Sequence, residues 1–242
     1  MYSRRITSAI LALASAAVLV ACSDDDDDDS TGPGNNDNTT VRFFNAAGGG
    51  LSLDIAENGT VGTGDGNIAF GAASSCMRVN NANPQLAVRA AGSTTSLTGF
   101  TPSFTADKSY TVLVGGTQAA PTFTTLDDAF TSPGTSAGVR IINATTAATT
   151  GTGNWDIYVN PGTTLGTPNA PGIGRNSASP FITVPAGQAN TLRLTNAGQT
   201  TTLLNISVPA ITAGNVSTIV VTDAATGTNT LRTFTLSPCP AS

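Results

Sequence analysis

The chain has 242 residues, of which only 10% are charged, and its formal net charge is −5. Two arginines and seven aspartates precede Val41, so the rest of the chain, with eight basic and eight acidic residues, is formally neutral. Without a basic stripe to neutralise phosphates, nucleic acid is excluded as the expected partner. The chain also has no histidine, which excludes Ser-His-Asp and Cys-His nucleophile activation and the usual imidazole metal sites.

The N-terminal segment has the pattern of a secretory signal. Arg4 and Arg5 form a basic start, and the apolar run 6–21 follows, as in signal peptides. About 16 apolar residues fall short of the ~20 that span a bilayer. The ending Leu-Val-Ala-Cys at 19–22 resembles the lipobox of bacterial lipoproteins. We therefore predict a signal peptide over 1–21, lipidation of Cys22, and a cell-envelope protein anchored to the membrane, facing the periplasm or the cell surface.

The segment 22–40 contains six consecutive aspartates followed by Ser, Thr, Gly, Pro and Asn residues. It offers almost no apolar surface whose burial could offset the entropy of ordering. After the lipidated cysteine, we therefore predict a disordered acidic tether.

An internal repeat organises the rest of the chain. Val-Arg-Phe-Phe-Asn-Ala at 41–46 returns as Val-Arg-Ile-Ile-Asn-Ala at 139–144, and Leu-Asp-Ile at 53–55 returns as Trp-Asp-Ile at 155–157. A period near 100 residues is that of a duplicated sandwich-sized domain, not of a solenoid unit. We predict repeat 1 over 41–131, repeat 2 over 137–236, a Ser-Pro-Gly-Thr-Ser junction between them, and a C-terminal tail over 237–242.

Each repeat contains short apolar-alternating runs between Gly, Asn and Pro residues, which is typical of strands. The clearest runs are 41–46, 51–57, 85–91, 109–115, 139–144, 154–159, 190–196 and 216–223. No segment has a sustained helical period. The sequence therefore predicts an all-β protein of two tandem immunoglobulin-like antiparallel β-sandwiches.

The opening strand of each repeat and the Trp-Asp-Ile-Tyr-Val run at 155–159 resemble the bacterial family called domain of unknown function 4397. Its members are secreted or lipid-anchored and often carry the domain in tandem. The resemblance covers most of 41–236. Asn45 and Asn143 stand where the family frequently has a histidine. The family has no settled activity, so the resemblance implies a fold and a location but no reaction.

Candidate catalytic residues are few. Asp54 and Asp156 occupy matching positions, but the period of two along a strand turns them away from the core, toward solvent or a neighbour such as Arg42 or Arg140. Lys108, the only lysine, lies in a turn. The adjacent acids at 127–128 point apart if extended.

Two further features have a functional and a structural interpretation. The segment 62–67 is oxygen-rich like a calcium loop, but it lacks alternating carboxylates and a terminal glutamate, so a plain inter-strand loop is favoured. Trp155, the only tryptophan, could stack on a sugar, but its strand position favours the core. No metal or other cofactor is predicted.

Cys76 and Cys239 are the cysteines that remain once Cys22 is lipidated. An even pair in an oxidising envelope predicts a disulfide; the alternative is two buried thiols.

Taken together, these features favour a lipid-anchored envelope protein that acts as a non-catalytic binding or structural module. Its partner would be an envelope or extracellular protein or glycan, contacted through loops such as 58–67 and 160–179. The catalytic residues are then none, and the ligand-binding residues stay open. One alternative is a carboxylate-dependent hydrolase acting on envelope glycans, which requires two acids converging in one cleft. Another is a surface adhesion or matrix protein.

Overall fold

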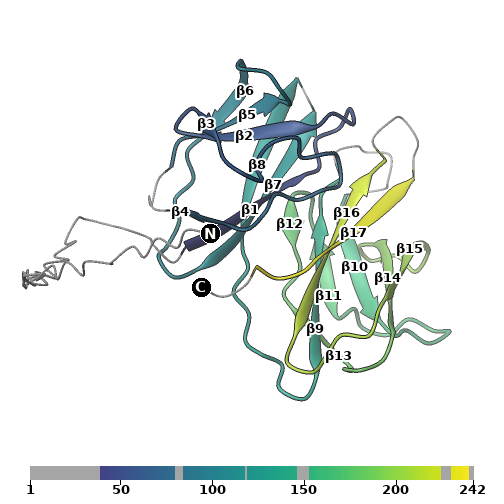
Figure 1. Ribbon diagram of the computed structural model, residues 1–242. Coiled ribbons are helices and arrows are strands. Elements are labelled where there is room, and N and C mark those ends of the chain that lie inside the picture. Colours follow the sequence, from purple (N-terminus) through teal and green to yellow (C-terminus); the bar gives the residue numbers. More distant parts are fainter. Residues whose placement is uncertain (1–38, 80–83, 118, 146–152, 225–229, 240–242) are drawn as a thin grey trace, which may run out of the picture. The chain divides into compact units, whose positions relative to one another are not determined.

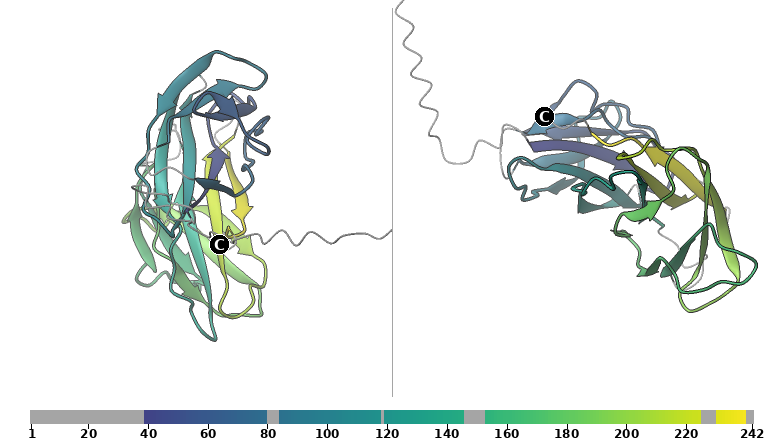
Figure 2. Two further views of the ribbon diagram at one scale, coloured as in Figure 1. Left: turned by 60° about the vertical axis from the view of Figure 1, so that its left-hand side comes forward. Right: turned by 90° about the horizontal axis from the view of Figure 1, so that it is seen from below.

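The computed structural model describes residues 39–79, 84–117, 119–145, 153–224 and 230–239. Every regular element in these ranges is a β-strand (Figures 1 and 2). No helix among these residues is long and apolar enough to cross a membrane. The predicted signal peptide, Cys22 and nearly all of the tether lie outside the described residues, and lipid anchoring stays a prediction.

Repeat 1 consists of two four-stranded sheets. Its inner sheet has the order β4-β1-β7-β8 and its outer sheet the order β3-β2-β5-β6. The strands are β1 (Thr39–Asn45), β2 (Leu53–Glu57), β3 (Thr60–Val61), β4 (Met77–Val79), β5 (Leu86–Ala90), β6 (Ser96–Phe100), β7 (Ser109–Thr117) and β8 (Ala120–Asp127). The two sheets enclose an apolar core that includes Phe43, Ile55 and Val88.

Repeat 2 has the same plan. Its inner sheet has the order β12-β9-β16-β17, with β13 also paired to β9, and its outer sheet has the order β11-β10-β14-β15. The strands are β9 (Ala137–Asn143), β10 (Trp155–Val159), β11 (Ala170–Ile173), β12 (Ser177–Ala178), β13 (Ile182–Val184), β14 (Asn190–Asn196), β15 (Thr202–Val208), β16 (Val216–Asp223) and β17 (Leu231–Leu236). Trp155, fully buried, lies in the core of this repeat, as predicted.

The structure is all-β and built from sandwiches, as the sequence predicts, with one departure. Most pairs are antiparallel, but β1 pairs parallel with β7, and β9 with β16. The first strand of each repeat therefore lies beside its penultimate one, a pairing that the alternation of apolar residues cannot reveal.

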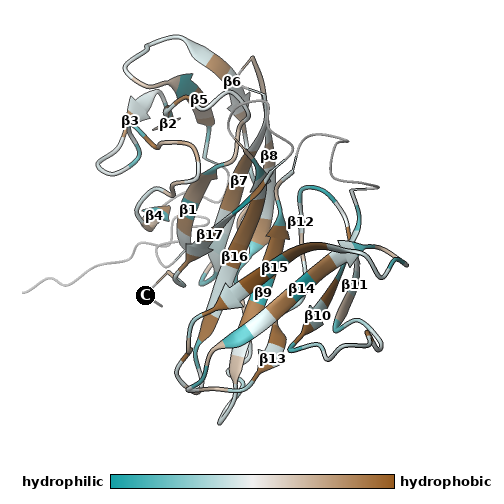
Figure 3. Cartoon of the chain, turned by 90° about the vertical axis from the view of Figure 1, so that its right-hand side faces the viewer, coloured by the Kyte–Doolittle hydropathy of each residue, from teal (hydrophilic) through white to brown (hydrophobic). Residues whose placement is uncertain are grey.

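The inner sheets are buried on both faces. A third apolar cluster packs the inner sheet of one repeat on the inner sheet of the other. Phe43 belongs to the core of repeat 1 and Phe44 to this junction; Ile141 and Ile142 divide in the same way. Double burial explains why these strands carry consecutive apolar residues instead of alternating ones. Figure 3 shows this hydrophobic character along β7, β9 and β16.

The junction between the repeats has two-fold character. The strand registers align five pairs of equivalent apolar residues in the junction cluster. They are Phe44 and Ile142, Ala46 and Ala144, Ala73 and Ala178, Leu113 and Val220, and Leu126 and Leu236. Contact of matching patches on two similar bodies is the pattern of an isologous interface. Both repeats accordingly lie in one compact unit, residues 34–242.

Candidate functional site

Asp54 and Asp156 brace the two outer sheets. The Asp54 carboxylate accepts hydrogen bonds from the backbone N–H groups of Asn67 (2.7 Å) and Gly92 (2.8 Å). Asp156 accepts the same pair of bonds in repeat 2, from Gly172 (2.9 Å) and Gly198 (2.8 Å). Both carboxylates are buried. The expectation that they face solvent or pair with Arg42 and Arg140 is therefore wrong, because the loops beside each strand fold over them.

Asn45 and Asn143 hold the end of the first strand of each repeat. The Asn45 amide donates to the carbonyls of Leu51 (2.9 Å) and Ile68 (2.8 Å), and the Asn143 amide donates to Gly153 (2.9 Å) and Ile173 (3.2 Å). Satisfied buried amides of this kind fix loop positions. The two asparagines are structural residues.

A second pair of braces was missed by the sequence analysis. The hydroxyl of Ser74 accepts a hydrogen bond from the backbone N–H of Phe43 (2.9 Å), and Ser179 does the same for Ile141 (3.0 Å). Each hydroxyl also donates to a neighbouring carbonyl. In the sequence, each of these serines follows the opening strand of its repeat by about 30 to 40 residues. The separations differ between the repeats because the loops differ in length, so the two serines do not align in the sequence repeat.

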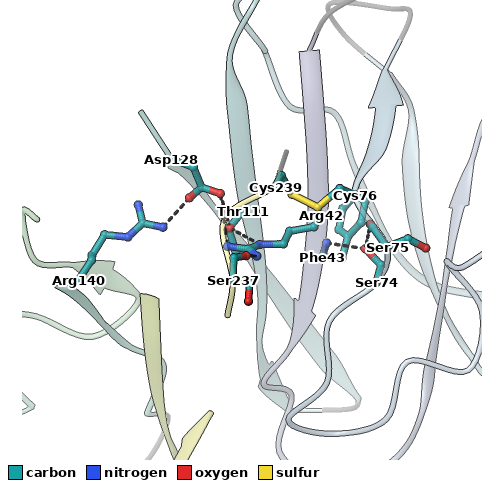
Figure 4. The surroundings of a disulfide bond; sticks show 10 residues. All are labelled: Arg42, Phe43, Ser74, Ser75, Cys76, Thr111, Asp128, Arg140, Ser237 and Cys239. Carbon is teal, nitrogen blue, oxygen red and sulfur yellow. Dashed lines mark hydrogen bonds and ion pairs between the residues drawn. A yellow bond between two sulfur atoms is a disulfide. The ribbon is translucent and has the colours of Figure 1, made fainter. Parts of the chain in front are cut away.

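A buried charge cluster crosses the junction between the repeats (Figure 4). Asp128 accepts from Arg140 of repeat 2 and from the Thr111 hydroxyl (2.7 Å), and it lies 3.6 Å from the Arg42 guanidinium of repeat 1. Arg42 also donates to Thr111 (2.9 Å) and to the carbonyl of Ser237. Burial lowers the pKa of Arg42, the charge of Asp128 opposes this, and that of Arg140 adds to it. One acid therefore serves two buried arginines.

The neighbouring acid has a different role. Asp127 binds the half-exposed Lys108 at 2.7 Å, while its carbonyl accepts from Arg140. The carboxylates of the two acids thus bind different basic residues and do not converge on a common cleft.

A disulfide joins Cys76 and Cys239, with an S–S distance of 2.04 Å (Figure 4). This is the pairing that the even cysteine count predicts. It ties the tail that follows β17 of repeat 2 to the segment that precedes β4 of repeat 1, beside the charge cluster. The disulfide and the Arg42–Ser237 bond therefore hold the same tail in place.

The loop 62–67 has a buried centre. Asp65 is 2% exposed, and its Oδ1 atom has no hydrogen-bond partner. Burial raises the pKa of Asp65 to about 6, and the charge of Glu57 adds to the effect. No group of three or more metal-ligating side chains occurs among the described residues. The loop packs against β2, where the backbone N–H of Ile55 donates to the Asp65 carbonyl (2.8 Å).

The candidate ligand site is a hollow on the outer sheet of repeat 1, where β5 and β6 meet the β2–β3 turn. It has a volume of about 550 Å³ and is open to solvent. Ala87 and Gly99 are cross-strand neighbours in it. Polar side chains surround them: Asn58, Gln85, Arg89, Ser96 and Thr101. We call this the β5–β6 hollow.

The polar groups of the β5–β6 hollow are largely unused. Within the described part of the chain, the side chains of Asn58, Gln85, Ser96 and Thr101 make no hydrogen bond, and the Arg89 guanidinium donates once, to the carbonyl of Gly59 (3.1 Å). Asn58 has a positive φ of 48° and donates its backbone N–H to Gln85. The turn therefore places two free amides at one end of the hollow.

The same place in repeat 2 carries larger side chains. Ala56 pairs with Ala87, and Tyr158 pairs with Arg193, at equivalent positions after Asp54 and Asp156. The next strand adds Gly99 in repeat 1 and Asn205 in repeat 2. The register is irregular at the same point in both sheets, after Val88 in the β5–β6 pair and after Leu194 in the β14–β15 pair. The residues of the two outer sheets can therefore be matched one to one.

The turn amides differ as well. Asn160, the counterpart of Asn58, donates to the Asn190 side chain (2.8 Å) and accepts from the backbone N–H of Thr191 (2.8 Å). Repeat 2 thus uses internally the group that repeat 1 presents to solvent.

Other hollows offer less chemistry. One of about 430 Å³ begins at Val208 and is lined mostly by apolar and small residues. Another, of about 230 Å³, lies beside Lys108 and Cys239, where the lysine is already paired with Asp127. Neither combines unused amides with an accessible floor as the β5–β6 hollow does.

The first repeat matches a known protein family. Residues 39–150 match the family described as Domain of unknown function (DUF4397), so this part of the chain is a DUF4397-like domain. The match extends from β1 through β9. Among curated proteins, none matches this chain.

The chain also matches solved structures. One is CBMbc, a family CBM26 domain of Eubacterium rectale Amy13K in complex with maltoheptaose, at 11% identity over 84% of this chain and 97% of that one, with a TM-score of 0.27. A streptococcal virulence factor described by its alpha-glucan binding shares 10% identity over 81% and 97%, with a TM-score of 0.27. The pneumococcal glycogen-degrading virulence factor SpuA gives 10% over 81% and 21%, with a TM-score of 0.29.

Proposed function

We propose that this protein is a lipid-anchored, non-catalytic binding module of the bacterial cell envelope, and that repeat 1 supplies its binding surface. The observation that carries the proposal is the β5–β6 hollow, where unused polar groups surround an accessible floor of Ala87 and Gly99. In repeat 2 the equivalent floor positions are Arg193 and Asn205. The two repeats share a scaffold, and this difference between them supports a binding surface on repeat 1.

Three of the described acids are already engaged within the fold, which supports a binding role. Asp54 and Asp156 are occupied by backbone N–H groups, and Asp128 by two arginines. Hydrolysis by a carboxylate pair needs two acids that face one substrate. The acids in these positions serve the fold instead, and the lining of the β5–β6 hollow contains no acidic residue.

Membrane attachment belongs to the proposal through Cys22, which follows the basic and apolar leader. Two or three acyl chains on such a cysteine give stable anchoring, since each buried methylene contributes about 0.8 kcal/mol. The acidic tether then separates the binding surface from the bilayer. Fatty-acid labelling of the wild type and of Cys22→Ser tests this part: label in the mutant contradicts it.

The binding surface is tested by filling it. Ala87→Arg and Gly99→Asn copy the residues of repeat 2 into repeat 1; a Cβ at Gly99 meets only the Leu86 carbonyl at 3.7 Å, an ordinary contact. The soluble mature chain with Cys22→Ser, with and without these substitutions, is immobilised and exposed to labelled envelope proteins and glycans. We expect the filled variant to lose the retained component. Equal retention by the two proteins contradicts the proposed surface.

A further inference from the structure

We propose that the β5–β6 hollow binds a saccharide, an inference that rests on the proposed function and names its ligand class. The argument starts from the groups that the hollow presents. The amides of Asn58 and Gln85 and the hydroxyls of Ser96 and Thr101 each both donate and accept hydrogen bonds. Sugar hydroxyls have the same dual character, so each pairing leaves no polar group unsatisfied.

The shape of the hollow fits a sugar ring better than a peptide side chain. Its floor is Ala87 and Gly99, two small neighbouring residues on adjacent strands, and its mouth is open. It offers a shallow bed and not a deep apolar socket. Its floor residue Ala87 belongs to β5, which is paired with β2 on one side and β6 on the other, so an extended peptide cannot add to the backbone ladder of that strand.

The charge of the hollow narrows the ligand further. Arg89 is its only charged residue, and its Nη2 atom already donates to Gly59 while Nε is buried without a partner. The lining contains no carboxylate, which disfavours a metal ion or a basic peptide as the ligand. A guanidinium can pair with two adjacent hydroxyls or with the carboxylate of a uronic acid. Both ligands are saccharides, and the experiment separates them.

The experiment measures binding of maltoheptaose, cellopentaose and trigalacturonic acid, and then of an immobilised oligosaccharide array, to the soluble mature chain by calorimetry and ¹⁵N chemical-shift titration. We expect at least one saccharide to bind. Gln85→Ala should weaken that binding about three- to tenfold, the effect of one hydrogen bond. Ala87→Arg with Gly99→Asn should abolish it. Arg89→Gln should affect an acidic saccharide more than a neutral one.

Matched controls come from repeat 2. Thr191→Ala is the counterpart of Gln85→Ala, because Thr191 accepts at its backbone carbonyl from Asn160 as Gln85 does from Asn58. Arg193→Ala is the counterpart of the floor change. Both should leave saccharide binding unchanged, and circular dichroism verifies that every variant is folded.

The outcomes distinguish this inference from the proposed function. If the filled variant loses an envelope component but no saccharide on the array binds, the ligand class is wrong and the binding surface stands. If a saccharide binds with equal affinity to the wild type and the filled variant, both the class assigned to the hollow and the surface itself are wrong. Loss of binding through Thr191→Ala would also overturn the assignment, by placing the ligand on repeat 2.

Discussion

The two repeats of this chain are alike in their braces and unlike on their outer faces. Asp54 and Asp156 each accept hydrogen bonds from two backbone N–H groups. Asn45 and Asn143 each donate hydrogen bonds to two backbone carbonyls. The floor positions of the β5–β6 hollow differ: small residues in repeat 1, and Arg193 and Asn205 in repeat 2. These aspartates and asparagines brace the fold in both repeats, whereas the proposed binding surface lies at floor positions where the repeats differ.

The largest loss of stability is expected from replacing Asp128, which lies at the junction and has no acidic counterpart in repeat 2. Asp128 serves Arg42 of one repeat and Arg140 of the other, while the matching position after β17 is Pro238. Asp128→Ala leaves two buried cations without a counter-charge and should lower the free energy of unfolding by about 3–5 kcal/mol. Urea denaturation measures it. The control is Asp127→Ala, which breaks a half-exposed pair and should cost below about 1 kcal/mol; equal effects contradict the account.

The disulfide is the next largest contribution. It closes a loop with a sequence separation of 163 residues between Cys76 and Cys239. Its loss therefore raises the conformational entropy of the unfolded chain and lowers the stability of the fold. Cys239→Ser should destabilise the chain by about 2–5 kcal/mol. Thermal unfolding with and without reductant checks this, because reductant should affect only the wild type. Free thiols in oxidised wild-type protein, found by non-reducing peptide mapping, would refute the bond.

The equivalence of the braces predicts equal effects in the two repeats. Asp54→Asn and Asp156→Asn each weaken two hydrogen bonds to a charged acceptor, which are worth about 1.5–3 kcal/mol each, and an amide retains one acceptor oxygen. We expect losses of about 2 kcal/mol that agree within experimental error. A loss confined to one variant, measured by denaturant unfolding, would show that the shared geometry hides different roles.

Asp65 differs from the two bracing aspartates because its Oδ1 atom has no hydrogen-bond partner. Its replacement should give the smallest change in stability, and that change should be a gain. The pKa of Asp65 in the folded state, about 6, lies above the ordinary aspartate value of 3.8, so the folded state holds the proton more tightly. Stability should therefore fall as the pH rises from about 4 to 6 and stay low above that. Asp65→Asn should remove this slope and stabilise the chain at pH 7 by about 1–2 kcal/mol. If stability depends on pH in the same way in Asp65→Asn and in the wild type, the raised pKa of the buried Asp65 carboxyl is contradicted.

Much of the fold was predictable because apolar residues mark strands. Runs 190–196 and 216–223 coincide with β14 and β16, and 41–46 lies within one residue or two of β1. The β8 and β17 strands carry Thr and half-buried residues without strict alternation. Each strand packs apolar residues both on the junction and on the core of its own repeat, Leu126 and Phe123 in β8 and Leu236 and Leu231 in β17, so its apolar residues do not alternate with polar ones.

The candidate site was less predictable. The hollow depends on which residue of β5 faces which residue of β6, and the register irregularity between Val88 and Arg89 shifts that pairing. The sequence repeat aligned Asp54 with Asp156, but only the strand register aligns Ala87 with Arg193. The sequence placed the binding surface on loops 58–67 and 160–179; Asn58 of the first loop contributes to the hollow, whereas its counterpart Asn160 is engaged internally.

The most direct test of the account is to locate the ligand on the chain by the backbone amide shifts of ¹⁵N-labelled soluble protein. With a saccharide that binds, the perturbed amides should cluster at Asn58, Gln85, Ala87 and Gly99, while those of Asn160, Arg193 and Asn205 remain unchanged. Perturbations centred on the equivalent residues of repeat 2 would contradict the claim that the β5–β6 hollow is the binding surface.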